Sequence, residues 1–199
     1  MGFVNQQWFD RPNSIVRARG DLGFEQRRNE LPVTASDGAV FTPIASGGMI
    51  SPQPYVVAVG SRLVRFGKGP LTPDAAGGDW WLEYDEYKKV ERFADARGVS
   101  VPFMVRELCC VMPEWNDMTM VLQARVMQPL IAYRGLGAPV TARGKIVFDA
   151  KVGEELGVMQ LLVPGLSVGD VRRDALFVTG YGFLPHEAST LGYVPKNPV

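Results

Sequence analysis

The sequence is poor in the residues from which metal sites and most nucleophilic sites are built. Its 199 residues include one histidine, His186, and two cysteines, Cys109 and Cys110. Adjacent cysteines rarely bridge each other because the geometry is strained, and this spacing fits no zinc site. We therefore expect no metal site, no Ser–His–Asp system, and two reduced thiols, at least one of them buried, in a reducing compartment.

The chain also lacks an excess of charge and a long apolar run. Lysine plus arginine number 21, as do aspartate plus glutamate, whereas general nucleic-acid binders carry a basic excess. No apolar run is long enough to span a membrane. The start, M-G-F-V-N-Q-Q-W, has neither the basic nor the apolar region of a secretory signal. These features predict no membrane association, no general nucleic-acid binding and a cytoplasmic location in the producing cell.

The distribution of residue types divides the chain in two. Residues 1–54 are rich in Pro, Gly, Ser and Asn, and their apolar residues follow no period, so we expect an irregular N-terminal arm. Residues 55–199 are expected to form a single α+β domain. Its sheet should be mostly antiparallel, with two helices inserted after the first core strand. Alternation and turn residues predict strands at 56–66, with Gly60 as a bulge, and at 118–126, 145–149, 158–163 and 175–183.

Two helices are expected between the first and second of these strands. The spacing of apolar residues predicts one helix over 83–97, with acidic residues at its start and Gly98 as its stop. A second is expected over 101–112, capped by Ser100 and ended by Pro113.

The stretch from Tyr55 to Gly98 holds the candidate binding residues. Arg65, followed by Phe66 and Gly67, stands near the end of an apolar strand, where its planar donor fork suits a phosphate or a carboxylate. A solvated edge residue or a structural salt bridge is the alternative. Trp80 and Trp81 form either an aromatic wall for a flat ring or part of the core.

Three short motifs resemble those of the ADP-ribosyltransferase superfamily, which includes the RES-type NAD-consuming toxins. Leu63–Gly67 is similar to an aliphatic-x-Arg-x-Gly strand. Gly78–Trp81, followed by Phe93 and Ala94, is similar to a second motif that leads into a helix. Gln160–Gly165 resembles a late strand in which Gln160 occupies the place of the acid.

The resemblance implies an effector or toxin that uses NAD as a substrate for ADP-ribosyl transfer or glycohydrolysis. Arg65 would hold the phosphates, Trp80, Trp81 and Tyr84 would border the nicotinamide, and Gly67 would also belong to the NAD-binding residues. The strand of Arg65 would lie beside that of Gln160, which would orient the ribose.

Because a glutamine has no negative charge to stabilise an oxocarbenium-like centre, either Glu154 or Glu155 supplies the acid or the domain binds without transfer. The partner would be a target protein or a cognate inhibitor, and delivery to another cell would need no cleaved signal peptide. The alternative is a non-enzymatic interaction module: an accessory protein of a phage, plasmid or secretion system.

Overall fold

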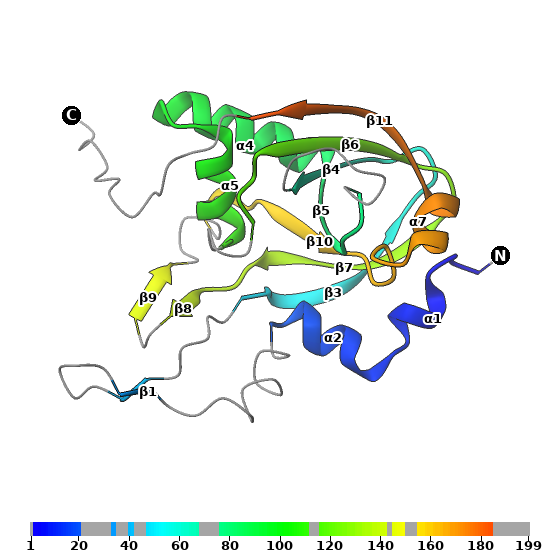
Figure 1. Ribbon diagram of the computed structural model, residues 1–199, viewed down its shortest axis with the longest axis horizontal. Helices are drawn as coiled ribbons and strands as arrows, with labels where there is room; N and C mark the ends of the chain where they lie inside the picture. The colour runs from blue at the N-terminus through cyan, green and yellow to red at the C-terminus, as the bar shows by residue number, and fades with distance from the viewer. Residues whose placement is uncertain are drawn as a thin grey trace.

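Seven strands form one antiparallel sheet in the computed structural model, which describes residues 2–20, 33–34, 40–41, 47–67, 76–111, 116–142, 145–149 and 155–184 (Figure 1). The strand order is β11-β6-β4-β5-β10-β7-β3. The strands are β3 Met49–Val57, β4 Arg62–Gly67, β5 Trp80–Glu83, β6 Met120–Val126, β7 Leu130–Gly137, β10 Met159–Leu162 and β11 Leu176–Phe183. The expected α+β fold with a mostly antiparallel sheet is confirmed.

Helices and two small ribbons complete the described part of the chain. The helices are α1 Gln6–Phe9, α2 Pro12–Ala18, α4 Tyr84–Arg97, α5 Val101–Cys109 and α7 Gly169–Ala175. The ribbons pair β1 Val33–Thr34 with β2 Val40–Phe41, and β8 Val140–Ala142 with β9 Lys145–Phe148. No helix in the described ranges is long and apolar enough to cross a membrane.

The sheet curls because of the short connection between β3 and β4. These strands are four places apart in the sheet, or about 19 Å if it were flat. The connection from Val57 to Arg62 reaches at most about 17 Å. Gly60 sits in this turn with φ 86° and donates its N–H to Val126 O at 2.8 Å. The prediction of one bulged strand over 56–66 is therefore wrong, because a glycine at positive φ serves a turn as well as a bulge.

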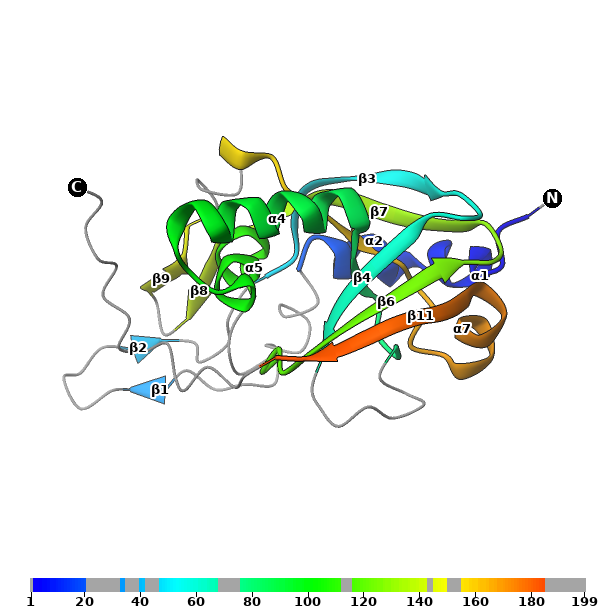
Figure 2. The same ribbon diagram turned by 90° about the horizontal axis from the view of Figure 1, so that it is seen from above.

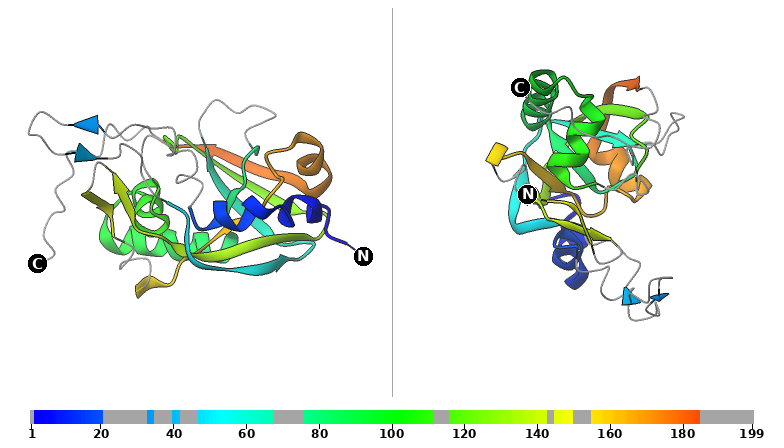
Figure 3. Two further views of the ribbon diagram at one scale, coloured as in Figure 1. Left: turned by 90° about the horizontal axis from the view of Figure 1, so that it is seen from below. Right: turned by 90° about the vertical axis from the view of Figure 1, so that its left-hand side faces the viewer.

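Three groups of buried side chains hold the curled sheet. The inner group lies inside the curl and includes Leu63, Trp81, Leu122 and Leu161. A second group packs α4 and α5 against Val64, Phe66 and Leu82, at the end of the sheet visible in Figure 2. The third places α1 and α2 against Tyr133 and Leu162, along β7 and β3 (Figure 3). Helices thus cover two parts of the outer face.

Several boundaries differ from the sequence predictions. The 83–97 helix is confirmed as α4, capped by Gly98 at φ 61°. It follows three core strands, β3, β4 and β5, rather than one. The second helix ends at Cys109 rather than at Met112, because Cys110 adopts a left-handed φ of 52°. Residues 1–54, expected to be irregular, contain α1, α2 and the start of β3, and α7 was also unexpected.

Strand β7 was missed because its last residues, Tyr133-Arg134-Gly135-Leu136-Gly137, look like a turn. Both glycines are required by close packing rather than by a turn. A Cβ on Gly135 would lie 3.0 Å from Ile50 O, and one on Gly137 would lie 2.9 Å from the carbonyl carbon of Cys109. The glycines therefore let β3 and α5 approach a continuous strand.

Both edges of the sheet are irregular. Strand β3 contains Pro52 and Pro54 and shifts register between Ile50 and Gln53. Strand β11 shifts register between Val178 and Gly180. Prolines and bulges hinder the addition of a further strand, so the irregular edges disfavour edge-to-edge aggregation.

The two cysteines are free and buried, as expected for reduced thiols. Cys109 packs in the α4–α5 group, and Cys110 forms the C-cap of α5. Burial, as the largest cause, raises the pKa of each thiol to about 12.

We expect the native protein to resist thiol reagents at pH 8, because a thiol with a raised pKa carries almost no thiolate at that pH. Titration with Ellman's reagent should find two groups in 6 M guanidinium chloride without reductant and none within minutes in the native state. Rapid reaction of the native protein would contradict the burial of both thiols, and no reactive group after denaturation would contradict their reduced state.

One buried side chain attaches the N-terminal segment to the sheet. Asn5 is fully buried, and its Nδ2 donates to Ile131 O and to Pro164 O, each at 2.8 Å. Its Oδ1 accepts from Ile131 N at 3.0 Å. Asn5 thereby satisfies three backbone groups of β7 and of the turn after β10.

We expect Asn5→Ala to lower the free energy of unfolding by about 2–4 kcal/mol, because it leaves buried backbone groups without partners. The measurement is urea denaturation followed by circular dichroism. The control is Gln6→Ala, whose amide bonds only the neighbouring, exposed Asp10 and which should cost less than about 0.5 kcal/mol. Equal effects of the two changes would contradict the anchoring role of Asn5.

Candidate functional site

Arg65 is a largely buried arginine on the inner face of β4. Its Nη1 donates to Trp80 O at 2.9 Å, and its guanidinium lies 5.9 Å from the centroid of the Trp81 ring. A Cβ on Gly78 would lie 2.1 Å from Nη2 of Arg65, so the guanidinium occupies the space in which a larger residue would place its side chain. Its Nε is buried and has no hydrogen-bond partner in the described ranges.

The surroundings of Arg65 are rich in positive charge around one carboxylate. Asp79, whose side chain is fully buried, pairs with Arg17 Nη2 of α2 at 2.6 Å and accepts from Ser167 N at 2.9 Å. Burial is the main cause that lowers the pKa of Arg65; Asp79 raises this pKa and Arg172 lowers it further. Arg17 thus pairs directly with Asp79, while the charges of Asp79 and Arg172 both act on the Arg65 guanidinium.

The aromatic candidates form packing contacts rather than an open wall. Trp81 is 2% exposed in the inner core, and its indole donates to Gly78 O at 2.8 Å. Trp80 is half-buried on the opposite face, beneath α1 and α2. Tyr84 packs with the α4–α5 group and lies beneath the guanidinium of Arg62. Gly67 ends β4 opposite Met120.

Gln160 lies on the outer face of β10, away from Arg65. It stands opposite Gly135, is 6% exposed, and its Nε2 donates to Gly48 O at 3.1 Å. The expectation that its strand adjoins that of Arg65 is wrong, because β5 lies between β4 and β10. Glu155 is exposed, and Glu154 lies outside the described residues.

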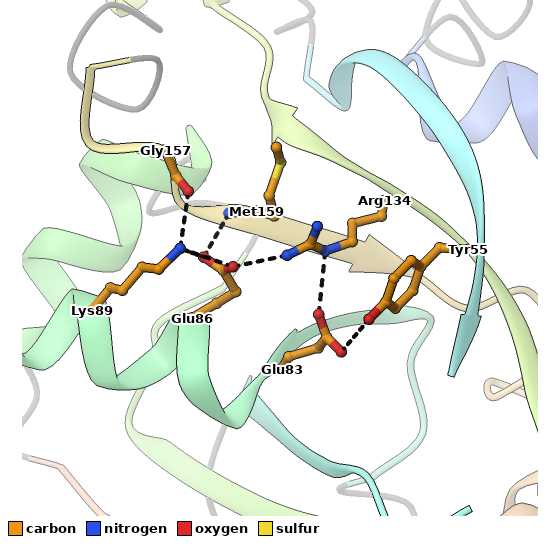
Figure 4. A network of polar contacts seen from close by, with 7 residues as sticks. All are labelled: Tyr55, Glu83, Glu86, Lys89, Arg134, Gly157 and Met159. Carbon is orange, nitrogen blue, oxygen red and sulfur yellow. Dashed lines mark hydrogen bonds and ion pairs between the residues drawn. The ribbon is translucent and has the colours of Figure 1, made fainter. Parts of the chain in front are cut away.

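A second polar cluster, which sequence reasoning missed, joins β5, α4, β7 and β10 (Figure 4). Glu86 is 4% exposed and accepts from Arg134 Nη2 at 2.9 Å, from Lys89 Nζ at 3.0 Å, and from Met159 N at 3.1 Å. These contacts satisfy both oxygens of Glu86 and fasten the first turn of α4 to β7 and β10.

Glu83, at the end of β5, is less enclosed than Glu86. Its Oε1 accepts from the Tyr55 hydroxyl at 2.9 Å, and its Oε2 lies 3.2 Å from Arg134 Nε in an ionic contact. Burial, followed by the hydrogen bond to Glu83, raises the pKa of Tyr55. Tyr55 therefore remains a protonated donor, and Glu83 keeps 21% of its side chain exposed.

Glu83 and Arg65 lie on the same face of neighbouring strands. In the β4–β5 register Leu63 stands opposite Glu83, and Arg65 lies two residues further along β4. Side chains two residues apart share a face, and such diagonal neighbours lie about 7–8 Å apart. Arg65 and Glu83 thus stand on one face of β4 and β5, with the Arg65 guanidinium at Trp80 O and Gly78 and the Glu83 carboxylate at Tyr55 and Arg134.

The overlooked residues carried weak sequence signals. Asp79 follows two glycines, and Glu83 and Glu86 resemble ordinary acids at a helix start.

The pentapeptide Gly165–Gly169 has the G-x-S-x-G form of hydrolases. However, the Ser167 hydroxyl lies 3.5 Å from Asp79 Oδ2, and the single histidine, His186, lies outside the described residues. No group of three or more metal-ligating side chains occurs in the part of the chain described.

Comparison with known proteins gives little further guidance. The chain matches no protein-family model and no curated protein. A chain in the solved structure of Tne2 in complex with Tni2 is similar, with a TM-score of 0.37 and 12% identity over 69% of this chain and 95% of that chain. A likeness this weak supports no functional argument, so the function must be argued from the site.

We expect Arg134→Met to lower the free energy of unfolding by about 2 kcal/mol, because it leaves the buried carboxylate of Glu86 with one cation fewer. Urea denaturation provides the measurement. The matched control, Arg92→Met, changes an exposed arginine of α4 and should alter stability by less than about 0.5 kcal/mol. An unchanged midpoint for Arg134→Met would show that the cluster does not stabilise the fold.

Proposed function

We propose that the domain binds NAD and cleaves its nicotinamide–ribose bond, passing ADP-ribose to water or to a protein target. The observation that carries this proposal is the diagonal placement of Arg65 and Glu83 on the inner face of β4 and β5. In NAD the pyrophosphate is joined to the nicotinamide ribose through a single methylene. A ligand of this kind needs an anion anchor and an acid that are neighbours, as these two residues are.

The phosphate end of the ligand is assigned to Arg65. Its Nε has no hydrogen-bond partner among the described residues, and the charge of Arg172 acts on the same guanidinium. A buried guanidinium binds an anion strongly because little water competes and because its planar fork matches phosphate oxygens. Arg17 pairs with Asp79 from α2, so an anion at Arg65 meets less repulsion from this carboxylate.

The reacting end is assigned to Glu83. When the glycosidic C–N bond breaks, its electron pair leaves with nicotinamide and positive charge develops on the ribose. A fixed carboxylate stabilises that charge, and water or a target nucleophile then attacks the ribose carbon and loses a proton. Tyr55 and Arg134 hold the carboxylate in place. This assignment supplies the acid for which Gln160, Glu154 and Glu155 were the sequence candidates.

In this proposal the domain acts as an effector, and a protein that covered the exposed side of Glu83 would inhibit it. Trp80, Trp81, Tyr84 and Gly67 then support the strand geometry, since the three aromatic residues pack in the core groups and Gly67 is buried at the end of β4. The predicted contacts of the aromatic residues with nicotinamide and of Gly67 with NAD are not part of the mechanism proposed.

A non-enzymatic interaction module is the second candidate function. The observation that favours it is the set of large apolar side chains left exposed, which are Val56, Val59, Met127, Phe177, Val178 and Tyr181. Exposed apolar residues that gather in one place mark interaction surfaces. The two functions are compatible, because an effector also meets a target or an inhibitor.

We expect titration calorimetry to show NAD binding that Arg65→Lys weakens by about tenfold to a hundredfold, because lysine keeps the charge but loses the fork. Glu83→Gln should bind NAD nearly as well as the native protein but release nicotinamide about 100-fold to 1,000-fold more slowly. Nicotinamide release is followed by chromatography.

Two controls make this measurement specific. Arg62→Lys lies on the same strand but on its outer face, and Glu155→Gln changes an exposed acid; both should leave binding and release unchanged. Absence of binding by the native protein at millimolar NAD would remove the proposal, as would equal affinity in Arg65→Lys. Loss of release in Glu155→Gln alone would return the acid role to the residues predicted from sequence.

A further inference from the structure

Two arginines stand directly opposite each other on the outer face of the sheet. In the β4–β6 register Arg62 pairs with Arg125, and in the β6–β11 register Arg125 pairs with Phe177. Directly opposed residues share a face, so Arg62, Arg125 and Phe177 form one row across three strands. All three are exposed, and Phe177 is 61% exposed. We call these three residues the outer row.

The outer row is unfavourable for the isolated protein. Like charges directly opposite each other destabilise a sheet. The Arg62 guanidinium lies 3.5 Å from the centroid of the Tyr84 ring, which holds it at the start of α4. No carboxylate among the described residues pairs with Arg62 or Arg125. A large exposed aromatic ring beside two arginines that lack a carboxylate partner in the described ranges is suited to binding an acidic, partly apolar partner.

Further apolar side chains extend this surface at the same end of the sheet. Val59 lies in the β3–β4 turn, where Gly60 N donates to Val126 O at 2.8 Å. Met127 donates its N–H to Ala175 O at 2.7 Å, next to the start of β11. Val59 is 60% exposed and Met127 is 50% exposed. These backbone hydrogen bonds place Val59 and Met127 beside the last residues of β6, which include Arg125, and the first residues of β11, which include Phe177.

We propose that the outer row, with Val59 and Met127 beside it, docks an acidic segment of a partner protein. Carboxylates of the segment would pair with Arg62 and Arg125, and an apolar side chain of the segment would cover Phe177. Aromatic and arginine side chains are the residues that most often anchor protein interfaces. Arg62 and Arg65 point to opposite faces of β4, so this surface is separate from the NAD site and does not rest on the proposed function.

The chemistry of the surface selects a protein segment over other partners. A nucleic acid would need a wider basic surface, whereas the chain has no net charge and the row offers two arginines. A membrane surface would likewise need more cations. Apolar contacts flanked by paired charges fit a peptide with alternating acidic and apolar residues.

The test uses three 12-residue fluorescein-labelled peptides that repeat Glu-Leu-Asp, Gln-Leu-Asn or Lys-Leu-Arg. Fluorescence polarisation with the full chain should detect binding of the acidic peptide alone, weakened by added salt. Arg125→Glu should weaken that binding at least tenfold, Arg125→Gln less, and Phe177→Ser severalfold. Arg92→Glu, the same charge reversal on exposed α4, should change it less than twofold. Circular dichroism verifies that each variant is folded.

Several results would overturn the proposal. These are no binding of the acidic peptide by the native protein, equal binding of the Gln-Leu-Asn peptide, and equal losses in Arg125→Glu and Arg92→Glu. Tighter binding of a 12-nucleotide single strand would identify a nucleic-acid surface instead. A native dimer in sedimentation equilibrium that Arg125→Glu converts to a monomer would identify a second copy of this chain as the occupant.

Discussion

The pairing of β5 is the constraint on which the rest of the structure depends. This strand has four residues, and it joins β4 by two residue pairs and β10 by two others. The two halves of the sheet therefore meet through a narrow seam, which buried residues on both sides must support. Trp81 fills the inside of the curl, and Glu83 reaches Tyr55 and Arg134 across it. The seam and the candidate site consequently use the same residues.

The two faces of β4 separate two kinds of surface. Odd-numbered residues, Leu63 and Arg65, face the inside of the curl, where burial strengthens electrostatic interactions. The outer residues Val64 and Phe66 lie under α4 and α5, which leaves Arg62 at the margin of the helical cover. Because α4 begins at Tyr84, whose ring lies beneath the Arg62 guanidinium, the helical cover ends there. The start of α4 thus sets the limit between packed sheet and exposed row.

The fold could be predicted from sequence where local signals agree with tertiary packing. Helix α4 has apolar periodicity, acids at its start and a glycine at its C-cap, and it forms where expected. Gly60, Gly135 and Gly137 could not be interpreted locally, since a turn, a bulge and a close approach all favour glycine. The position of Arg65 on a strand was predictable, but its neighbours were not, because Arg17, Asp79 and Arg172 come together only through the curl.

The choice between Glu83 and Glu86 follows from how their charges are compensated. Glu86 receives Lys89, Arg134 and a backbone N–H, so its charge is balanced and its position is fixed. Glu83 shares Arg134 with Glu86 and otherwise receives a neutral hydroxyl from Tyr55. Lys89 contacts Glu86, and Arg134 lies between the two acids, so Glu83, the more exposed of the two, has fewer charged contacts. The less enclosed carboxylate is the one that a developing cation can approach, whereas the enclosed one serves the fold.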